Sequence, residues 1–389
     1  MYPSLYYAIK DLFGLDLPFF KMVQSFGFFV AISFLFAAYF LSKELKRKEQ
    51  QGLIEPHTVK VLKGQRATPA ELITSGIIGF IVGFKVLFIA LNFSAFTENT
   101  QGFLLSLQGN FIGGLLGAAA AAYMKYSEKE KTKREPPELE LETVHPYQLV
   151  GNITLIAAFA GIIGAKIFHN LENWDDFMAH PMEALLSFSG LTMYGGLIVA
   201  SVACIWYGKK NGIKTTHLID ATAPSLMLAY GVGRLGCQIA GDGDWGIPSV
   251  HPKPFGFLPD WMWSYDYPHN VVSEGVPLEN CLTDKYCNHL VPGVYPTPFY
   301  EAVMCISLFF VLWYLRKRIS TPGVLFCVYL IFNGIERFFI EKIRVNTLYD
   351  VNGFKFTQAE LISTILFFLG VSGIFYFRKL QQKQLAAKS

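Results

Sequence analysis

Long apolar stretches separated by short polar segments dominate this chain. Each is close to the roughly 20 residues that a helix needs to cross a bilayer. The pattern predicts about nine transmembrane helices, at Phe20–Leu41, Leu72–Phe93, Leu104–Met124, Leu149–Phe168, Gly190–Tyr207, Leu218–Ile239, Phe299–Leu315, Val324–Ile340 and Ala359–Phe377. The predicted fold class is therefore an all-α polytopic membrane protein.

Lysines and arginines are concentrated in alternate loops. Clusters follow the first, third, fifth, seventh and ninth apolar stretches, whereas loops 94–103 and 169–189 contain neither residue. Basic loops stay on the cytoplasmic side of a membrane. We therefore expect the N-terminus outside the cytoplasm, the C-terminus inside it, and the long segment 241–297 on the outer side.

The composition agrees with a protein that lies largely in lipid. Hydrophobic residues make up 52% of the chain and charged residues only 16%, compared with about 25% charged in soluble domains. The formal net charge is only +3, and nucleic-acid binding is not expected. No cleavable signal peptide is predicted, since basic residues follow the first apolar stretch instead of preceding it.

Two cysteines lie close together in the outer segment. Cys281 and Cys287 predict a disulfide because the compartment outside the cytoplasm is oxidising; the alternative is a pair of free thiols. His289 stands alone beside them, and no metal site is predicted.

A two-helix hairpin occurs twice. The stretch "IVGFKVLFIALN" (81–92) matches "IIGAKIFHNLEN" (162–173), and "LLSLQGNFIGGLLGA" (104–118) matches "LLSFSGLTMYGGLIVA" (185–200). Lys85 and Lys166 occupy equivalent positions, as do Leu104 and Leu105 and the leucines 81 residues later. A parallel duplication explains this better than chance similarity between glycine-rich membrane helices.

The repeat and the loops suggest a division of the chain into five parts. Residues 1–71 hold the first transmembrane helix and a cytoplasmic loop, and residues 72–126 an extra, duplicated hairpin. A charged cytoplasmic linker (127–147) leads to a core of residues 148–377 that contains the outer insertion 241–297, and residues 378–389 form a cytoplasmic tail.

Charged residues interrupt three of the predicted spans. Arg234 lies in "GVGRLGC" with Asp242 and Asp244 after it, Glu301 in "YPTPFYEAV", and Glu336, Arg337 and Glu341 in "NGIERFFIEKIR". Charges within the membrane are costly and are functional by default. One alternative is a set of structural ion pairs, Arg234–Glu301 or Arg337–Glu341. The other is a phosphate site, since a guanidinium matches phosphate oxygens, and phosphate at membrane depth indicates a phospholipid headgroup.

Several of these motifs resemble, in the same order, the bacterial prolipoprotein diacylglyceryl transferase family. The segments are "APSLMLAYGVGRLGCQIAGDGDWGIPS" (223–249), "YPTPFYEA" (295–302), "GVLFCVYLIFNGIERFFIEKIR" (323–344) and "MYGGLIVA" (193–200). The resemblance implies a phosphatidylglycerol–prolipoprotein diacylglyceryl transferase. Such an enzyme moves the diacylglyceryl group of phosphatidylglycerol to a lipobox cysteine, forming a thioether. It implies a periplasmic N-terminus, a multi-pass protein of the bacterial inner membrane, and no cofactor.

The resemblance also suggests roles for individual residues. Arg234 and Arg337 match two phosphate-binding arginines, Glu341 a functional acid, and Tyr194 the position of the family histidine. The predicted substrate-binding residues are Asp242, Gly246, Tyr300, Glu301, Gly195, Gly196 and Lys166. Cys237 is expected to serve packing, because the attacking cysteine belongs to the substrate.

The chain departs from the family pattern in ways that leave a second function open. Tyr194 replaces the histidine, and tyrosine is a poor base at neutral pH. The alternative is a divergent paralogue that binds phospholipid or lipoprotein as a subunit or assembly factor of an envelope complex. Its protein partners would bind the extra hairpin or segment 241–297. A transporter is less well supported, because the repeat is parallel instead of inverted.

Overall fold

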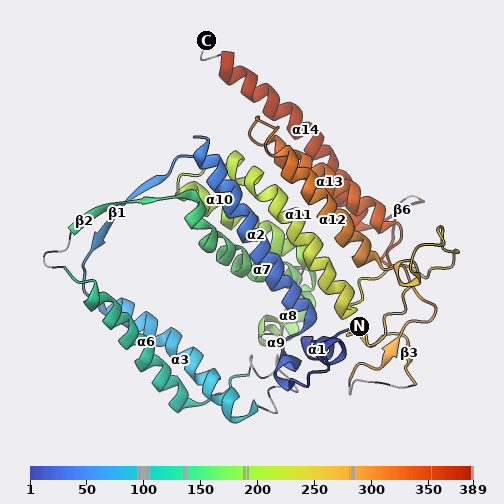
Figure 1. The fold of residues 1–389 in the computed structure, drawn as a ribbon, viewed down its shortest axis with the longest axis horizontal. Helices are drawn as coiled ribbons and strands as arrows, with labels where there is room; N and C mark the ends of the chain where they lie inside the picture. The colour runs from blue at the N-terminus through green and yellow to red at the C-terminus, as the bar shows by residue number, and fades with distance from the viewer. Residues whose placement is uncertain are drawn as a thin grey trace. The chain divides into compact units, whose positions relative to one another are not determined.

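The computed structural model describes residues 1–93, 96, 103, 106–134, 136, 138–186, 190, 192–279, 281, 285–351 and 353–386 (Figure 1). Its long helices are α2 (Ser25–Gln50), α3 (Pro69–Leu91), α6 (Phe111–Lys131), α7 (Val150–Glu172), α10 (Met193–Lys210), α11 (Thr215–Ala240), α12 (Thr297–Leu315), α13 (Val324–Glu341) and α14 (Gln358–Ala386). The short helices are α1 (Leu5–Phe13), η1 (Pro18–Met22), η2 (Pro146–Leu149), α8 (Trp174–Ala179), α9 (Pro181–Leu186) and η3 (Asp260–Met262). The strands are β1 (His57–Lys63), β2 (Glu138–Val144), β3 (Val276–Pro277), β4 (Asn288–His289), β5 (Tyr349–Val351) and β6 (Phe354–Phe356).

Each predicted apolar stretch coincides with one of the long helices, and the protein is a polytopic membrane protein of the all-α class. Among the described residues, five segments are long and apolar enough to cross a membrane by length and composition alone: α2, α3, η2 with α7, α12 and α14. Helices α6, α10, α11 and α13 carry charged residues among their apolar ones. The number of spans and their orientation remain predictions.

One helix start and one short helix differ from the sequence-based expectation. The third span was expected from Leu104, but α6 begins at Phe111 because the Asn110 side chain accepts a hydrogen bond from the Gly113 N–H (2.9 Å) and caps the helix. Leu104 and Leu105 lie outside the described residues. The short helix α1 was not predicted, and Leu12 and Phe13 on it are exposed.

The contacts divide the chain into two compact units. The first comprises Met1–Glu55, Pro146–Leu155 and Cys204–Ser389, and the second comprises Pro56–His145 and Ile156–Ala203. The five-part division expected from the sequence remains a prediction.

Helix α11 is the centre of the first unit. It packs against α2, α12 and α13, and α13 packs along α14 (Figure 1). Met227, Cys305, Phe309 and Leu325 belong to the buried core between these helices. Glycines allow the helices to approach closely: a Cβ at Gly236 would lie 2.9 Å from the Phe29 Cβ on α2.

A second set of buried charges lies where α2 and α12 end. Glu44 is fully buried and is paired with Arg47 (2.5 Å) and with Arg316. The Arg316 guanidinium lies 3.4 Å from the centre of the Trp313 ring. This buried pairing is at the opposite end of α12 from Glu301.

The second unit contains the helix pair α3–α6 and a two-stranded sheet. Thr68 and Glu71 form a capping box that begins α3. Strands β1 and β2 pair antiparallel, from His57 opposite Val144 to Lys63 opposite Glu138.

The two hairpins that the sequence relates share local contacts. The Asn110 N–H donates to the Phe84 carbonyl (2.9 Å), and the equivalent Thr192 N–H donates to the Ala165 carbonyl (3.1 Å). Lys85 donates to the Phe103 (3.0 Å) and Gln108 (2.9 Å) carbonyls, so its charge is taken up by backbone oxygens between the helices. The Asn110 and Thr192 contacts are equivalent in the two hairpins, and the duplication remains a prediction.

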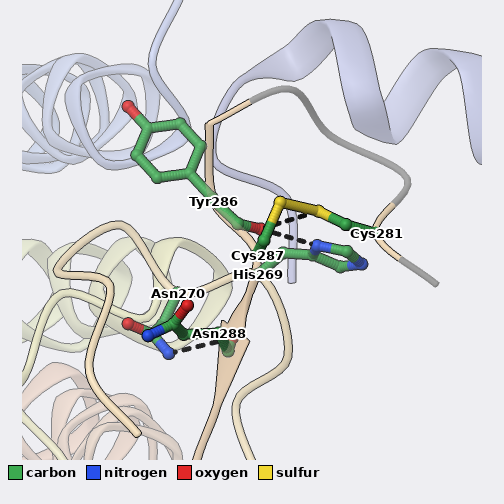
Figure 2. Close-up of a disulfide and its surroundings, with 6 residues drawn as sticks. All are labelled: His269, Asn270, Cys281, Tyr286, Cys287 and Asn288. Carbon is green, nitrogen blue, oxygen red and sulfur yellow. Dashed lines mark hydrogen bonds between the residues drawn. A yellow bond between two sulfur atoms is a disulfide. The ribbon is translucent and has the colours of Figure 1, made fainter. Parts of the chain in front are cut away.

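The outer segment 241–297 is held by a disulfide and by one buried amide. Cys281 and Cys287 form the disulfide that the sequence predicts, and the Cys281 sulfur lies 3.7 Å from the Tyr286 carbonyl (Figure 2). Asn270 is fully buried and donates to the Tyr267, Glu274 and Asn288 carbonyls (3.2, 3.0 and 3.2 Å). The Cys281–Cys287 prediction is therefore confirmed.

Candidate functional site

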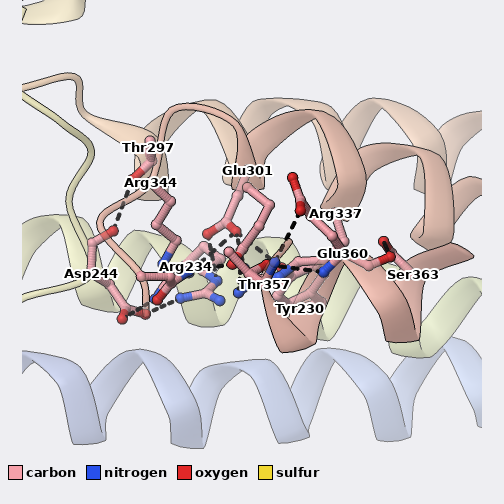
Figure 3. Close-up of polar contacts among 12 residues, drawn as sticks. Tyr230, Arg234, Asp244, Thr297, Glu301, Arg337, Arg344, Thr357, Glu360 and Ser363 are labelled. Atoms are coloured by element: carbon pink, nitrogen blue, oxygen red, sulfur yellow. Dashed lines mark hydrogen bonds and ion pairs between the residues drawn. The ribbon is translucent and has the colours of Figure 1, made fainter. Parts of the chain in front are cut away.

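The charges that interrupt α11, α12 and α13 meet in the first unit (Figure 3). Helix α11 carries Arg234 near its C-terminal end, α12 carries Glu301 near its N-terminal end, and α13 carries Arg337 near its C-terminal end. Loop residues that follow α11 and α13 complete the set. We call it the arginine cluster: Arg234, Asp244, Glu301, Arg337, Glu341 and Arg344.

Glu301 is the central carboxylate of the arginine cluster and is fully buried. One oxygen is 2.7 Å from Arg234 Nε, and the other accepts from Arg337 Nη1 (2.7 Å). The second oxygen also accepts from the Tyr230 hydroxyl (3.3 Å) and lies 3.6 Å from Arg344 Nη1. Burying a carboxylate costs free energy unless it is paired in this way, and the pairs of Glu301 link α12 to α11 and α13.

Asp244 joins two arginines from the loop side. Its carboxylate is paired with both Arg234 and Arg344, and the Thr297 hydroxyl donates to its backbone carbonyl (2.8 Å). Burial alone would raise the pKa of Asp244, but Arg234 and Arg344 outweigh burial and hold this pKa below its ordinary value. Asp244 therefore stays ionised at the membrane edge.

Glu341 completes the pairing on α13. It lies 3.1 Å from Arg337 Nη2 and accepts from the Asn346 side-chain amide (2.5 Å). Both ion pairs that the sequence suggested, Arg234–Glu301 and Arg337–Glu341, are therefore formed.

Three arginines in this cluster face three carboxylates, so their formal charges balance. Each arginine already has a carboxylate partner. Arg344 Nη1 has no hydrogen-bond partner among the described residues, so an anionic ligand can bind unused N–H donors of the guanidinium groups as well as replace a carboxylate. Three guanidinium groups offer donors in the flat, forked geometry that fits phosphate oxygens, and they remain charged at any working pH.

Glycines shape the loop that brings Asp244 to the arginines. Helix α11 ends at Gly241, which has a φ of 64°, and Gly243 follows with a φ of 97°. Both values lie in the left-handed region that glycine adopts easily. A Cβ at Gly246 would lie 2.5 Å from the Ile343 carbonyl oxygen, so only glycine lets the segment carrying Arg344 come this close.

The two aspartates of this loop differ in their contacts. Asp244, not Asp242, pairs with the arginines, whereas Asp242 accepts a hydrogen bond from the Asp244 N–H (3.3 Å). Burial and the neighbouring Asp244 charge raise the pKa of Asp242. The substrate-binding role expected for Asp242 remains a prediction.

One group of residues in this loop has the composition of a cation site. Ligand atoms of Cys237, Asp242 and Asp244 lie within 4.8 Å of one another. Both oxygens of Asp244 already face arginines, which disfavours a cation there. Cys237 is buried on α11, as expected for a packing residue.

The remaining predicted residues lie away from the arginine cluster or in the second unit. The Tyr300 hydroxyl donates to the Met262 carbonyl (2.5 Å), so it holds the outer segment. Tyr194, Gly195, Gly196 and Lys166 belong to the second unit, and their part in any reaction remains a prediction.

The two glycines serve close helix packing. A Cβ at Gly195 would lie 2.7 Å from the Gly164 carbonyl oxygen, and one at Gly196 would lie 2.8 Å from the Gly161 carbonyl oxygen. Helices α7 and α10 therefore approach each other through glycine on both sides.

Sequence reasoning missed two members of the polar network. Arg344 follows the end of α13 and was given no role, although it stands three residues after Glu341 in "NGIERFFIEKIR". Tyr230 is four residues before Arg234 on the same helix face, but a tyrosine in an apolar span carries no distinctive signal.

Comparisons with known proteins identify the family of this chain. The family model for prolipoprotein diacylglyceryl transferase matches residues 129–376. Relatives named phosphatidylglycerol–prolipoprotein diacylglyceryl transferase occur in several bacteria. The Dehalococcoides mccartyi protein is 27% identical over 240 residues, which cover 61% of this chain and 80% of that protein.

Two further relatives carry the same name. The Staphylococcus xylosus protein is 30% identical over 223 residues, which cover 57% of this chain and 71% of that protein. The Shouchella clausii protein is 27% identical over 273 residues, which cover 69% of this chain and 85% of that protein. The match includes all six residues of the arginine cluster, and the chain belongs to the prolipoprotein diacylglyceryl transferase family of membrane enzymes.

Proposed function

We propose that this protein transfers the diacylglyceryl group of phosphatidylglycerol to the cysteine of a lipobox peptide, in the inner membrane of a bacterium. The substrate thiol attacks the phosphate-bearing carbon of the diacylglyceryl group. A carbon–sulfur bond forms, the carbon–oxygen bond breaks, and the electron pair leaves with glycerol phosphate. The product is a thioether, and the thiol proton passes to a base.

The arginine cluster is the observation that carries this proposal. Arg234 is buried and Arg337 and Arg344 are partly buried among apolar helices, at the end of α12 that the basic loops predict to face outward. A phospholipid headgroup is the phosphate that reaches this place. Arg234, Arg337 and Arg344 bind its oxygens through their N–H donors, beside or in place of the carboxylates.

The same arginines support the chemistry of the leaving group. As the carbon–oxygen bond breaks, negative charge grows on the phosphate. Donors that are already oriented in a site without bulk water stabilise such charge better than water does. Asp244 and Glu301 hold Arg234 in place before the lipid arrives.

The paralogue function remains the second candidate. Tyr194 stands where the family histidine is expected, and the extra hairpin α3–α6 offers a surface to a protein partner. Such a protein would bind phosphatidylglycerol through the arginine cluster without transferring its diacylglyceryl group.

A transfer assay with purified protein separates these candidates. Phosphatidylglycerol labelled in its diacylglyceryl group is incubated with a lipobox peptide, and the labelled peptide is measured. We expect wild-type transfer, and a loss of about 100-fold or more in Arg234→Ala and in Arg337→Ala, because each removes a charge that stabilises the leaving group. Tyr194→Phe reports whether the phenol takes part.

Arg316→Lys is the matched control, since Arg316 is also buried and paired with a glutamate but lies at the other end of α12. It is expected to change stability and leave transfer intact. Folded wild-type protein that binds phosphatidylglycerol and transfers nothing would favour the paralogue function.

A further inference from the structure

Glu336 is a buried carboxylate that forms no ion pair with the arginine cluster among the described residues. It is 3% exposed, and neither of its oxygens has a hydrogen-bond partner among the described residues. Burying a carboxylate in this way costs free energy. The cost is unexplained if the residue only packs, because leucine or phenylalanine would fill the same space in α13 without it.

Glu336 directly precedes Arg337 of the cluster, near the C-terminal end of α13. The charged groups that act on it are Glu301, Arg337, Arg234 and Arg344. The charge of Glu336 acts in turn on three titratable groups: Cys305 on α12, Tyr230 on α11 and Tyr329 on α13. Cys305 is one helical turn further into α12 than Glu301, and Tyr230 is one turn further into α11 than Arg234.

We infer that Glu336 accepts the proton of the substrate thiol in this chain. The inference rests on the proposed transferase function. A sulfur that displaces an oxygen from carbon approaches from the side opposite the leaving oxygen. With the phosphate held by the arginines, the sulfur therefore approaches from the side of the carbon away from them, and a base is needed there.

Glu336 is the carboxylate in this group best suited to take a proton. Glu301, Asp244 and Glu341 are each paired with arginine, and pairing stabilises the ionised form. Glu336 has no such hydrogen bond, and accepting a proton removes the cost of its buried charge. Because it is 3% exposed, neighbouring side chains have to move before the thiol reaches it.

The proton transfer balances the reaction. The thiol gives its proton to the Glu336 carboxylate, and its sulfur bonds to the glycerol carbon. Glycerol phosphate leaves with one more negative charge than the phosphodiester had, and Glu336 becomes neutral. The total charge of the site is unchanged. Glu336 then releases the proton before the next turnover.

A change of nucleophile tests this role. Transfer is measured to two lipobox peptides, one with cysteine and one with selenocysteine, whose selenol is already ionised at neutral pH and needs no base. Glu336→Gln is expected to lose about 100-fold in kcat with the cysteine peptide. With the selenocysteine peptide it should stay within about tenfold of wild type. The KM for phosphatidylglycerol should be unchanged.

Two further variants make the result specific. Glu336→Asp keeps a carboxylate and should retain part of the transfer to the cysteine peptide. Glu341→Gln removes an acid of the same helix that is paired with Arg337, and it should reduce transfer to both peptides alike. Phosphatidylglycerol binding by each variant verifies that it is folded.

Three results would overturn the inference. An equal loss of transfer to both peptides in Glu336→Gln would mean that the residue is structural. Full transfer to the cysteine peptide in this variant would mean that the base is elsewhere. Wild-type protein that is inactive with both peptides would overturn the transferase function and, with it, this role of Glu336. The first two results leave the transferase function standing.

Discussion

Asp242 and Asp244 stand two positions apart in one loop and have opposite electrostatic environments. Asp244 faces Arg234 and Arg344, which hold its pKa below the ordinary value against the effect of burial. Burial and the charge of Asp244 raise the pKa of Asp242. Ionisation of Asp244 therefore stabilises the folded protein at neutral pH, and ionisation of Asp242 destabilises it.

The two asparagine variants are expected to shift stability in opposite directions. Asp244→Asn should lower the midpoint of thermal unfolding at pH 7, because two arginines lose a charged partner. Asp242→Asn should raise it, because an unfavourable buried charge is removed. The measurement is thermal unfolding in detergent, followed by circular dichroism.

The pH dependence follows from the same shifts. The stabilisation from Asp244 is complete above its unfolded pKa of about 3.9 and disappears as the pH falls through its lower folded value. The difference between wild type and Asp244→Asn should therefore shrink in acid. An equal loss of stability in both asparagine variants would contradict this account.

At the scale of helices, glycine determines how closely the extra hairpin packs. A Cβ at Gly83 on α3 would clash with the Gly113 carbonyl oxygen on α6, and one at Gly79 would clash with the Gly117 carbonyl oxygen. Gly76 lies on the same helix with more room: a Cβ there would be 3.9 Å from the Ala118 carbonyl oxygen. A Cβ therefore fits at Gly76 but not at Gly79 or Gly83.

Gly83→Ala is expected to reduce the free energy of unfolding of the hairpin by about 1–3 kcal/mol, since α3 and α6 have to separate. Gly76→Ala is the matched control and should leave it unchanged or slightly higher, because alanine favours the helix and fits the available space. Unfolding in mixtures of detergent and SDS measures both. Equal behaviour of the two variants would show that close packing does not stabilise the pair.

At the scale of the whole molecule, the chain is a polytopic membrane protein whose orientation is predicted by its basic loops. Segment 241–297 is expected outside the cytoplasm, and it contains the Cys281–Cys287 disulfide. The basic residues that follow α2 are expected inside.

Labelling of single cysteines from one side of the membrane tests the orientation. Phe257 is 84% exposed in the outer segment, and Leu53 is 43% exposed after α2. In intact cells with a permeable outer envelope, a membrane-impermeant maleimide should label Phe257→Cys and spare Leu53→Cys. Leu53→Cys should react once the membrane is broken. The reverse pattern would require the opposite topology.

Much of the site could be predicted from the sequence because charges in apolar helices are rare and conspicuous. Arg234, Glu301, Arg337 and Glu341 were all found in this way, and the structure brings them together. Arg344 could not be found, because an arginine just beyond a helix looks like any other loop residue. Its role depends on a loop folding back against Gly246, and no local pattern encodes that contact.

The sequence by itself determined which segments form the long helices, because a bilayer requires continuous apolar stretches with satisfied backbone hydrogen bonds. It also determined the candidate disulfide, through the spacing of two cysteines in an outer segment. The tertiary structure alone decided the pairing: Asp244 instead of Asp242 faces the arginines, and Glu336 is left without a hydrogen-bond partner among the described residues. Such choices depend on where three helices and two loops meet, since the partners of a buried charge come from distant parts of the chain.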